Sequence, residues 1–266
     1  RRQRQMCIRD RSSISPETYY STAAQLEANL NDEYPNVLPS FGQWTYGIFG
    51  EDKGTDNQIE VNANDRYTQD RWKVPHSESD NWKFERIYRI NFFLSEALPK
   101  FGEDMSGSQN TISGSVATIK HYIGEMYFLR AYEYFKKLQL FGDFPIINQP
   151  LADEMEALRE ASKRFPRNEV ARFIISDLDK AYAYMSDVDM ATTRINKDAA
   201  MLVKSRVALF EATWLQNFKG TAFVPGGEGW PGASLHNNYQ YPSGNLDNEV
   251  KYFLEQAVEA LSLIHI

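Results

Sequence analysis

The chain has 266 residues, 42% of them hydrophobic and 24% charged, which excludes a disordered or collagen-like protein. Its formal net charge of −7 argues against a nucleic-acid binder, because such a protein needs a basic face for phosphates. The single cysteine, Cys7, excludes an internal disulfide framework, and no apolar run approaches the roughly 20 residues that span a membrane.

The two ends of the chain have an unusual sequence. Residues 6–11 and 261–266 can both be translated from one nucleotide word, AGATGTGTATAAGAGACAG, read on opposite strands. This word resembles a transposon adaptor that is used to prepare sequencing libraries. We therefore expect residues 1–11 and 261–266 to be artefactual ends, and residues 12–260 to be an incomplete helical domain. Under this hypothesis Cys7 is neither a lipid-anchored nor a redox cysteine.

Helical patterns begin at Ser15–Glu17, where a capping side chain precedes proline at the first helical position. Apolar residues follow at helical spacing, and Pro35 is expected to end this helix. A second apolar stripe covers residues 82–98 and predicts a helix that ends at Pro99.

The later helices are indicated by stripes and by capping residues. Residues 119–138 predict a long amphipathic helix that ends at Gly142. Asn168 and Asn196 can each cap a further helix, and a last one begins near Val250. The pattern therefore predicts about six helices in hairpin-like pairs, an α-helical array without a clean 34-residue repeat.

Two long segments, residues 36–79 and 220–245, lack a helical period and are rich in glycine and aromatic residues. Long irregular loops on a rigid scaffold usually carry function. Sugar recognition needs flat apolar faces beside planar hydrogen-bonding groups, and both segments offer them. The candidate ligand-binding residues are Trp44, Asp56, Asn57, Tyr67, Arg71, Trp72 and Trp230, with Tyr239 and Tyr241 nearby. Packing against the scaffold is the alternative role of each ring, and Trp82 and Trp214 are expected in the core.

Motifs for catalysis, metal binding and cofactor binding are absent from the sequence, so no catalytic residue, metal or cofactor is expected. The segment Gly227–Gly232 matches GxGxxG, but no strand precedes it, and we interpret it as an irregular loop. Glu125 and Glu133 lie two turns apart and are expected on a solvated face, with Arg130 within reach of both. His121 is expected to be a surface or capping residue.

The segment Gly124–Phe135 reads GEMYFLRAYEYF, and FGDFP follows at Phe141–Pro145. Together they closely resemble the core motif of the SusD/RagB family, G-E-A-x-F-L-R-A-x-x-Y-F followed by F-G-D-V-P. Similar patterns in the neighbouring helices extend the resemblance to residues 15–214. Met126 stands where alanine is commoner in the family, and Phe144 stands where valine is.

The resemblance implies an all-α fold, a tetratricopeptide-like superhelix of helical hairpins with long irregular ligand-binding loops. It also implies an outer-membrane, cell-surface lipoprotein whose lipid anchor is missing from this sequence. Such proteins bind an oligosaccharide or polysaccharide, sometimes a peptide, deliver it to a SusC-like TonB-dependent transporter and catalyse nothing. Within the motif we expect Gly124 to allow close helix packing, Phe128 and Leu129 to fill the core, and Arg130 and Glu125 to form structural ion pairs or caps.

Two other functions stay open at this point. The helical array could be an interaction scaffold that binds a protein or peptide through aromatic side chains. A glycosidase that uses two acidic loop residues, such as Asp56 and Asp70, is the third interpretation. An incubation with glycans would separate the three functions. Depletion of a glycan without products indicates a binding protein, release of products indicates an enzyme, and no effect favours the interaction scaffold.

Overall fold

The computed structural model describes residues 19–39, 57–58, 81–102, 104–186 and 190–265. Within these ranges the chain forms seven α-helices and one short 3-10 helix, and isolated β-bridges join Thr22 to Ser113 and Phe144 to Phe165. The all-α prediction is therefore confirmed. The elements are α3 (Ala23–Val37), α4 (Glu85–Phe101), α5 (Val116–Phe141), α6 (Met155–Ala161), α7 (Arg167–Tyr184), α8 (Lys197–Asn217), η3 (Pro231–Ser234) and α9 (Leu246–His265).

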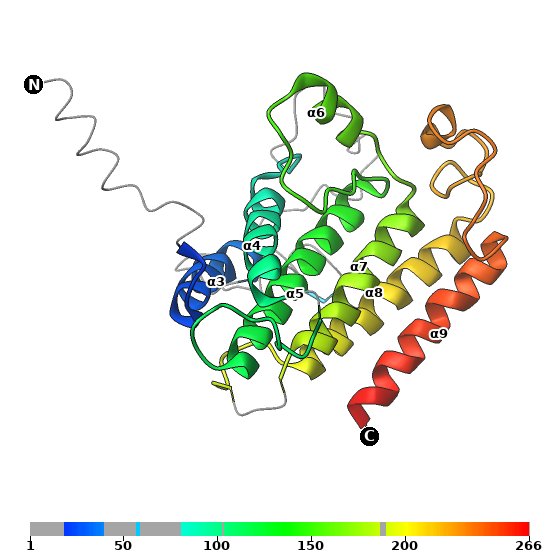
Figure 1. Ribbon diagram of the computed structural model, residues 1–266. Coiled ribbons are helices and arrows are strands. Elements are labelled where there is room, and N and C mark those ends of the chain that lie inside the picture. The colour runs from blue at the N-terminus through cyan, green and yellow to red at the C-terminus, as the bar shows by residue number, and fades with distance from the viewer. Residues whose placement is uncertain (1–18, 40–56, 59–80, 103, 187–189, 266) are drawn as a thin grey trace, which may run out of the picture.

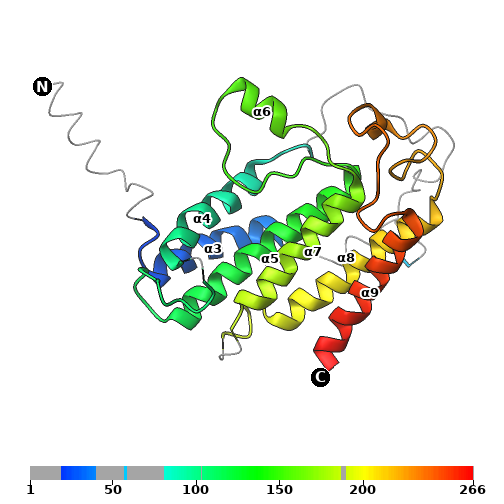
Figure 2. The same cartoon turned by 45° about the vertical axis from the view of Figure 1, so that its right-hand side comes forward.

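The long helices lie side by side as successive hairpins (Figure 1, Figure 2). Helix α5 packs against α3, α4 and α7, then α7 packs against α8 and α8 against α9. The array thus runs in chain order from α3 and α4 at one edge to α9 at the other, as in tetratricopeptide-like folds. The short helix α6 and the segment that contains η3 project from the same end of the array (Figure 1).

Helix α5 is the centre of the array and is buried on nearly all sides. Side chains that point in different directions around it, such as Ile123, Glu125 and Ala131, have no exposed surface. The sequence predicted an amphipathic helix here, and this was wrong because α3 and α4 cover one side of α5 while α7 covers the other. Phe128 and Leu129 are buried in this core as expected.

The prolines do not end the first two described helices. Helix α3 continues past Pro35 to Val37, and α4 continues past Pro99 to Phe101. A proline in the last turn removes only one hydrogen bond to the turn before it, so the helix can still close. Thr22 begins α3 with a capping box, whereas the start that was predicted at residues 15–17 lies outside the described residues.

Trp82 and Phe84 lie before α4 rather than on it, because the helix begins at Glu85. Both rings pack on Phe144, with ring centroids 4.9 and 5.2 Å from it. Trp82 is only partly buried against the core, and so is Trp214 on α8. The two tryptophans therefore border the core instead of filling it.

Two helix starts differ in how they are capped. The Asn196 side chain accepts a hydrogen bond from the Ala199 N–H at 2.9 Å, which confirms the predicted cap of α8. Asn168 does not cap α7, because it lies inside the helix and is fully buried. The helix begins one residue earlier, and Asp143 accepts from the Arg167 N–H at 2.9 Å instead.

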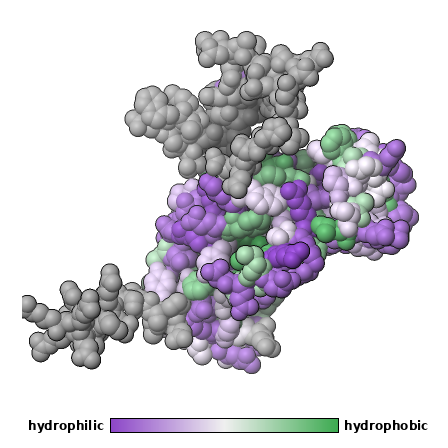
Figure 3. All heavy atoms as spheres, turned by 90° about the horizontal axis from the view of Figure 1, so that it is seen from above, coloured by the Kyte–Doolittle hydropathy of each residue, from purple (hydrophilic) through white to green (hydrophobic). Residues whose placement is uncertain are grey.

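The surface seen in Figure 3 is mainly hydrophilic, with separate hydrophobic patches between the charged residues. Within the described ranges, no helix combines the length and the apolar character that crossing a bilayer requires. The exposed apolar residues include Tyr88, Leu140, Met155, Phe223 and Val258. Some of these border the cavity described below.

Candidate ligand-binding site

A cavity of about 720 Å³ opens where α5 ends and the segment 218–245 folds back. The turn Gly142–Pro145 forms one wall, because Gly142 has a φ of +67° that turns the chain sharply out of the helix. Trp214, Phe223 and Trp230 contribute aromatic rings to the lining, and Asp143, Arg164 and Arg167 contribute charges. Rings beside planar charged groups are the combination that suits a saccharide.

Asp143 joins the turn after α5 to two other elements. One carboxylate oxygen accepts from the Arg167 N–H at 2.9 Å, and the other accepts from Trp230 Nε1 at 2.8 Å. Burial raises the pKa of Asp143, and these two hydrogen bonds partly oppose the shift. The carboxylate thus holds the start of α7 and the ring of Trp230 close together at the cavity.

Arg167 lines the cavity, but its charge is compensated by Glu211. It forms three hydrogen bonds of 2.9–3.2 Å to Glu211, which is fully buried on α8. Its guanidinium also lies 4.1 Å from the centroid of the Trp214 ring. Burial raises the pKa of Glu211, and the charge of Arg167 opposes that shift.

Trp230, a predicted ligand-binding residue, is only 5% exposed. Its ring stacks on His236 at a centroid distance of 6.0 Å, and its N–H is used by Asp143. Tyr239 donates its hydroxyl to Asn168, and Tyr241 donates its hydroxyl to the Pro225 carbonyl at 2.6 Å. Tyr239 thus holds the loop on α7, Trp230 holds it on the turn after α5, and Tyr241 closes the loop on itself. Trp230 therefore lines the cavity but exposes little of its ring to a ligand.

Phe223 presents an aromatic ring that is exposed to solvent at this site. Its side chain is 61% exposed, and its carbonyl accepts from Trp214 Nε1 at 3.1 Å. The ring also packs edge-on against Phe218, which limits its movement. Phe223 is not among the ligand-binding residues predicted from the sequence, although it lies between glycines and prolines in an aromatic loop, as Trp230 does.

Most of the first predicted loop, residues 36–79, lies outside the described residues. Trp44, Asp56, Tyr67, Arg71 and Trp72 all lie outside the described residues. Asn57 is described and is exposed. Asp70, the second carboxylate of the glycosidase interpretation, also lies outside the described residues. The roles assigned to the residues of this loop remain predictions.

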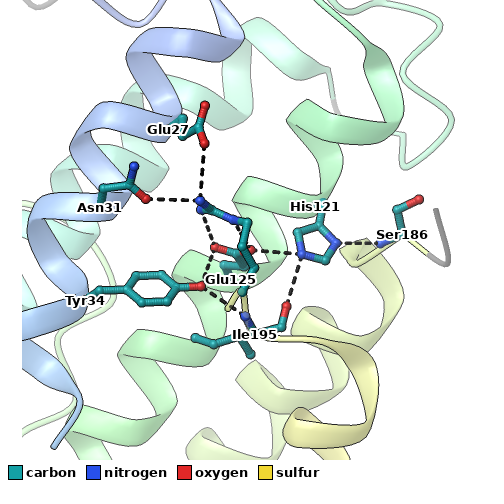
Figure 4. A network of polar contacts seen from close by, with 8 residues as sticks. Glu27, Asn31, Tyr34, His121, Glu125, Ser186 and Ile195 are labelled. Carbon is teal, nitrogen blue, oxygen red and sulfur yellow. Dashed lines mark hydrogen bonds and ion pairs between the residues drawn. The ribbon is translucent and has the colours of Figure 1, made fainter. Parts of the chain in front are cut away.

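The family-like motif on α5 is internal rather than part of this cavity. Glu125 is fully buried, and both of its oxygens are bound by Arg194 at 2.8 and 2.7 Å (Figure 4). Tyr34 on α3 donates to the same carboxylate at 2.8 Å, and His121 lies 2.9 Å from it. The expectation of a solvated carboxylate was wrong, because residues far away in the chain surround it.

His121 is also buried, contrary to its predicted surface position. Its Nδ1 accepts from the Ser186 N–H at 3.1 Å, so Nε2 carries the proton and donates to the Ile195 carbonyl at 3.1 Å. The ring therefore ties α5 to both ends of the connection between α7 and α8 (Figure 4). Its role in this network is structural.

Arg130 binds neither glutamate, although the sequence placed it within reach of both. Its Nε and Nη2 donate to the two oxygens of Asp177 on α7 at 2.6 and 2.8 Å. Glu133 is buried as well and pairs with Lys136 at 2.7 Å. The expectation that Arg130 and Glu125 form structural ion pairs is confirmed.

Among the described residues, no cluster of histidine, cysteine and carboxylate side chains could hold a metal ion. The described part is thus a helical-hairpin scaffold with a cavity built by irregular segments, which is the architecture of a ligand-binding protein. The family model described as "Starch-binding associating with outer membrane" matches residues 11–209, so the chain belongs to the SusD-like family.

Known relatives are similar over most of this chain. SusD-like protein P2 of Formosa agariphila is 26% identical over 79% of the chain, and SusD-like protein P25 of the same organism is 25% identical over 77%. The chain spans about two fifths of the length of these curated relatives, 41% and 39%. A solved SusD-like carbohydrate binding protein from Bacteroides vulgatus is 15% identical with a TM-score of 0.49, covering 73% of this chain and 43% of that one.

Proposed function

We propose that this chain is part of a cell-surface protein that binds a glycan, or another nutrient, at the outer membrane and hands it to a SusC-like TonB-dependent transporter. The full protein would be lipid-anchored and would bind its ligand without altering it. The observation that carries the proposal is the family match over residues 11–209, whose description joins starch binding to the outer membrane. Residues 12–260 would be the N-terminal helical domain, between artefactual ends.

The geometry of the cavity supports the same proposal. A volume of about 720 Å³ is large enough for a short oligosaccharide, and Phe223 offers an open ring on which a sugar face can stack. The walls are held by hydrogen bonds that Asp143 accepts and by the buried pair of Arg167 and Glu211, so little ordering is needed on binding. The first loop, with Trp44, Tyr67 and Trp72, is proposed to add further ligand contacts.

A panel of purified glycans tests the proposal. The chain is incubated with each glycan, and free ligand and reaction products are both measured. Depletion of one glycan without products is the expected result. Release of shorter sugars would indicate a glycosidase, and no retention of any glycan would favour the interaction-scaffold alternative.

Trp72→Ala tests the first loop within this proposal. We expect weaker glycan retention on affinity gels and an unchanged far-ultraviolet circular dichroism spectrum, because a stacked ring contributes about 1 kcal/mol of binding without supporting the helices. Phe223→Ala is the parallel variant for the cavity. Equal retention by both variants and the unaltered chain would remove both rings from the site.

A further inference from the structure

Three charged side chains line the cavity, and two of them already have partners. Arg167 is held by both oxygens of Glu211, so its charge is compensated within the protein. Asp143 accepts one hydrogen bond at each oxygen, from Arg167 and from Trp230. The third charged side chain is Arg164, which is exposed.

Arg164 differs from the other buried or cavity-lining arginines. Among the residues that the structure describes, no carboxylate forms a direct ion pair with it, whereas Arg130, Arg167 and Arg172 each bind one. Asp143 is near enough for the charge of Arg164 to oppose the rise of its pKa on burial, but its two oxygens accept from other groups. Its guanidinium lies 4.6 Å from the ring centroid of Trp82. Stacking on the ring uses one face of the guanidinium plane and leaves its N–H edge able to donate.

The backbone at Arg164 is fixed on both sides. Its carbonyl accepts from His236 Nε2 at 2.8 Å, which joins it to the loop that carries Trp230. The next residue, Phe165, forms a two-way bridge with Phe144, with hydrogen bonds of 3.1 and 3.2 Å. The guanidinium is thus presented from a rigid position, although it is exposed.

We propose that the cavity takes an anionic saccharide, and that Arg164 binds its acidic group. A planar guanidinium donates two parallel hydrogen bonds to a carboxylate or to a sulfate ester, a geometry that a neutral hydroxyl does not offer. The exposed ring of Phe223 and the exposed Leu235 supply apolar surface for the sugar itself. This inference rests on the proposed glycan-binding function and names its ligand class.

The overall charge of −7 opposes the approach of an anionic ligand. An acidic protein repels anions at long range, so an anionic ligand is held only by a local positive group. We therefore expect binding to depend on one residue, Arg164, and to weaken as salt screens this contact.

The test compares three ligands of similar length by isothermal titration calorimetry: an oligouronate, a sulfated oligosaccharide and a neutral oligosaccharide. The variants are Arg164→Gln, Arg164→Lys and, as a control with the same charge change, Arg159→Gln on the exposed side of α6. Arg164→Gln is expected to lower affinity for an anionic ligand by about tenfold or more. Arg164→Lys should lower it by less, because lysine keeps the charge but cannot donate two parallel hydrogen bonds from one planar group. Arg159→Gln should leave affinity unchanged.

The arms separate the possible failures. Preference for the uronate or for the sulfated sugar identifies the acidic group, and either supports the inference. Retention of neutral glycans alone, or unchanged anion binding in a folded Arg164→Gln variant with normal melting temperature, would overturn it while leaving the proposed function intact. Failure to bind a glycan of any class would overturn both.

Discussion

Gly124 lies at the point where α5 passes closest to α7. A Cβ atom built on it would lie 2.9 Å from the Ala181 carbonyl oxygen and 2.9 Å from the Met185 backbone nitrogen. Both are backbone atoms, so neither can turn away as a side chain would. Close packing at this glycine was predicted from the motif and is confirmed.

Gly124→Ala should therefore destabilise the protein, although alanine is the better helix former by about 1 kcal/mol. We expect a net loss of about 1–3 kcal/mol in the free energy of unfolding, because α5 and α7 must separate to admit the methyl group. Urea denaturation followed by circular dichroism measures it. Ser95→Ala on the exposed side of α4 is the control, and a Gly124→Ala variant as stable as the unaltered chain would contradict the packing argument.

Arg130 and Asp177 form an ion pair that is nearly inaccessible to solvent. Removal of either partner leaves a buried charge, so Arg130→Met and Asp177→Asn should each cost about 3–5 kcal/mol. The double variant should cost clearly less than the sum of the two, which a double-mutant cycle measures. The exposed pair Lys163 and Glu160 is the control, and its cycle should give no more than about 1 kcal/mol.

At the scale of elements, the start of α8 depends on one local hydrogen bond. Asn196→Ala should cost about 1 kcal/mol, because the Ala199 N–H loses its acceptor, and Asn196→Asp should retain most of the stability. Thermal unfolding of the three proteins is the measurement. Similar losses for alanine and aspartate would mean that Asn196 acts through something other than its cap.

The segment 218–245 is attached to the helices through Glu249 at the start of α9. This carboxylate is buried and accepts from Nε and Nη2 of Arg172 at 2.7 and 2.8 Å, from Asn168 at 3.1 Å and from the Ser243 N–H at 3.1 Å. Burial acts to raise its pKa, but the hydrogen bonds from Arg172, Ser243 and Asn168 outweigh burial and leave the pKa of Glu249 below its ordinary value.

A lowered pKa in the folded state makes Glu249 stabilising above the pKa of the unfolded chain, about 4.3. That contribution is lost as the pH falls further, through the folded-state pKa of Glu249. We expect Glu249→Gln to reduce stability at pH 7 and to lose less than the unaltered chain between pH 5 and pH 3. Chemical denaturation at several pH values measures this, with the exposed Glu255→Gln as control. Parallel pH profiles for Glu249→Gln and the unaltered chain would refute it.

For the whole molecule, the outer face of α9 is notable because apolar side chains recur along it. Leu254, Val258 and Leu261 are 40%, 65% and 41% exposed and lie three to four residues apart, on one side of the helix. Such a stripe favours association of the chain with apolar molecules in solution.

Leu254→Gln with Val258→Gln should lower the fluorescence of a bound hydrophobic dye and reduce self-association at high concentration. The melting temperature should change by only a few degrees, because both side chains are exposed. Analytical ultracentrifugation and dye titration are the measurements. Dye binding that stays at the original level would place the apolar surface elsewhere.

The amino-acid order is enough to specify the local features of this protein. The helices α5, α7 and α8, the cap at Asn196, the close approach at Gly124 and the family resemblance could all be predicted, because periodicity and capping depend on residues within a few positions of one another. Family membership is confirmed by the match over residues 11–209.

The partners of the buried polar groups depend on how the helices pack and not on the local sequence. The hydrogen-bonded partners are far apart in the sequence: the separation is 69 residues for Glu125 and Arg194, 47 for Arg130 and Asp177, and 87 for Trp230 and Asp143. No spacing in the chain encodes such partners, because they meet only when separate helices pack and when burial forces each charge to be compensated. The same packing closes the rings of Trp230, Tyr239 and Tyr241 into the scaffold and leaves Phe223 and Arg164 open beside the cavity.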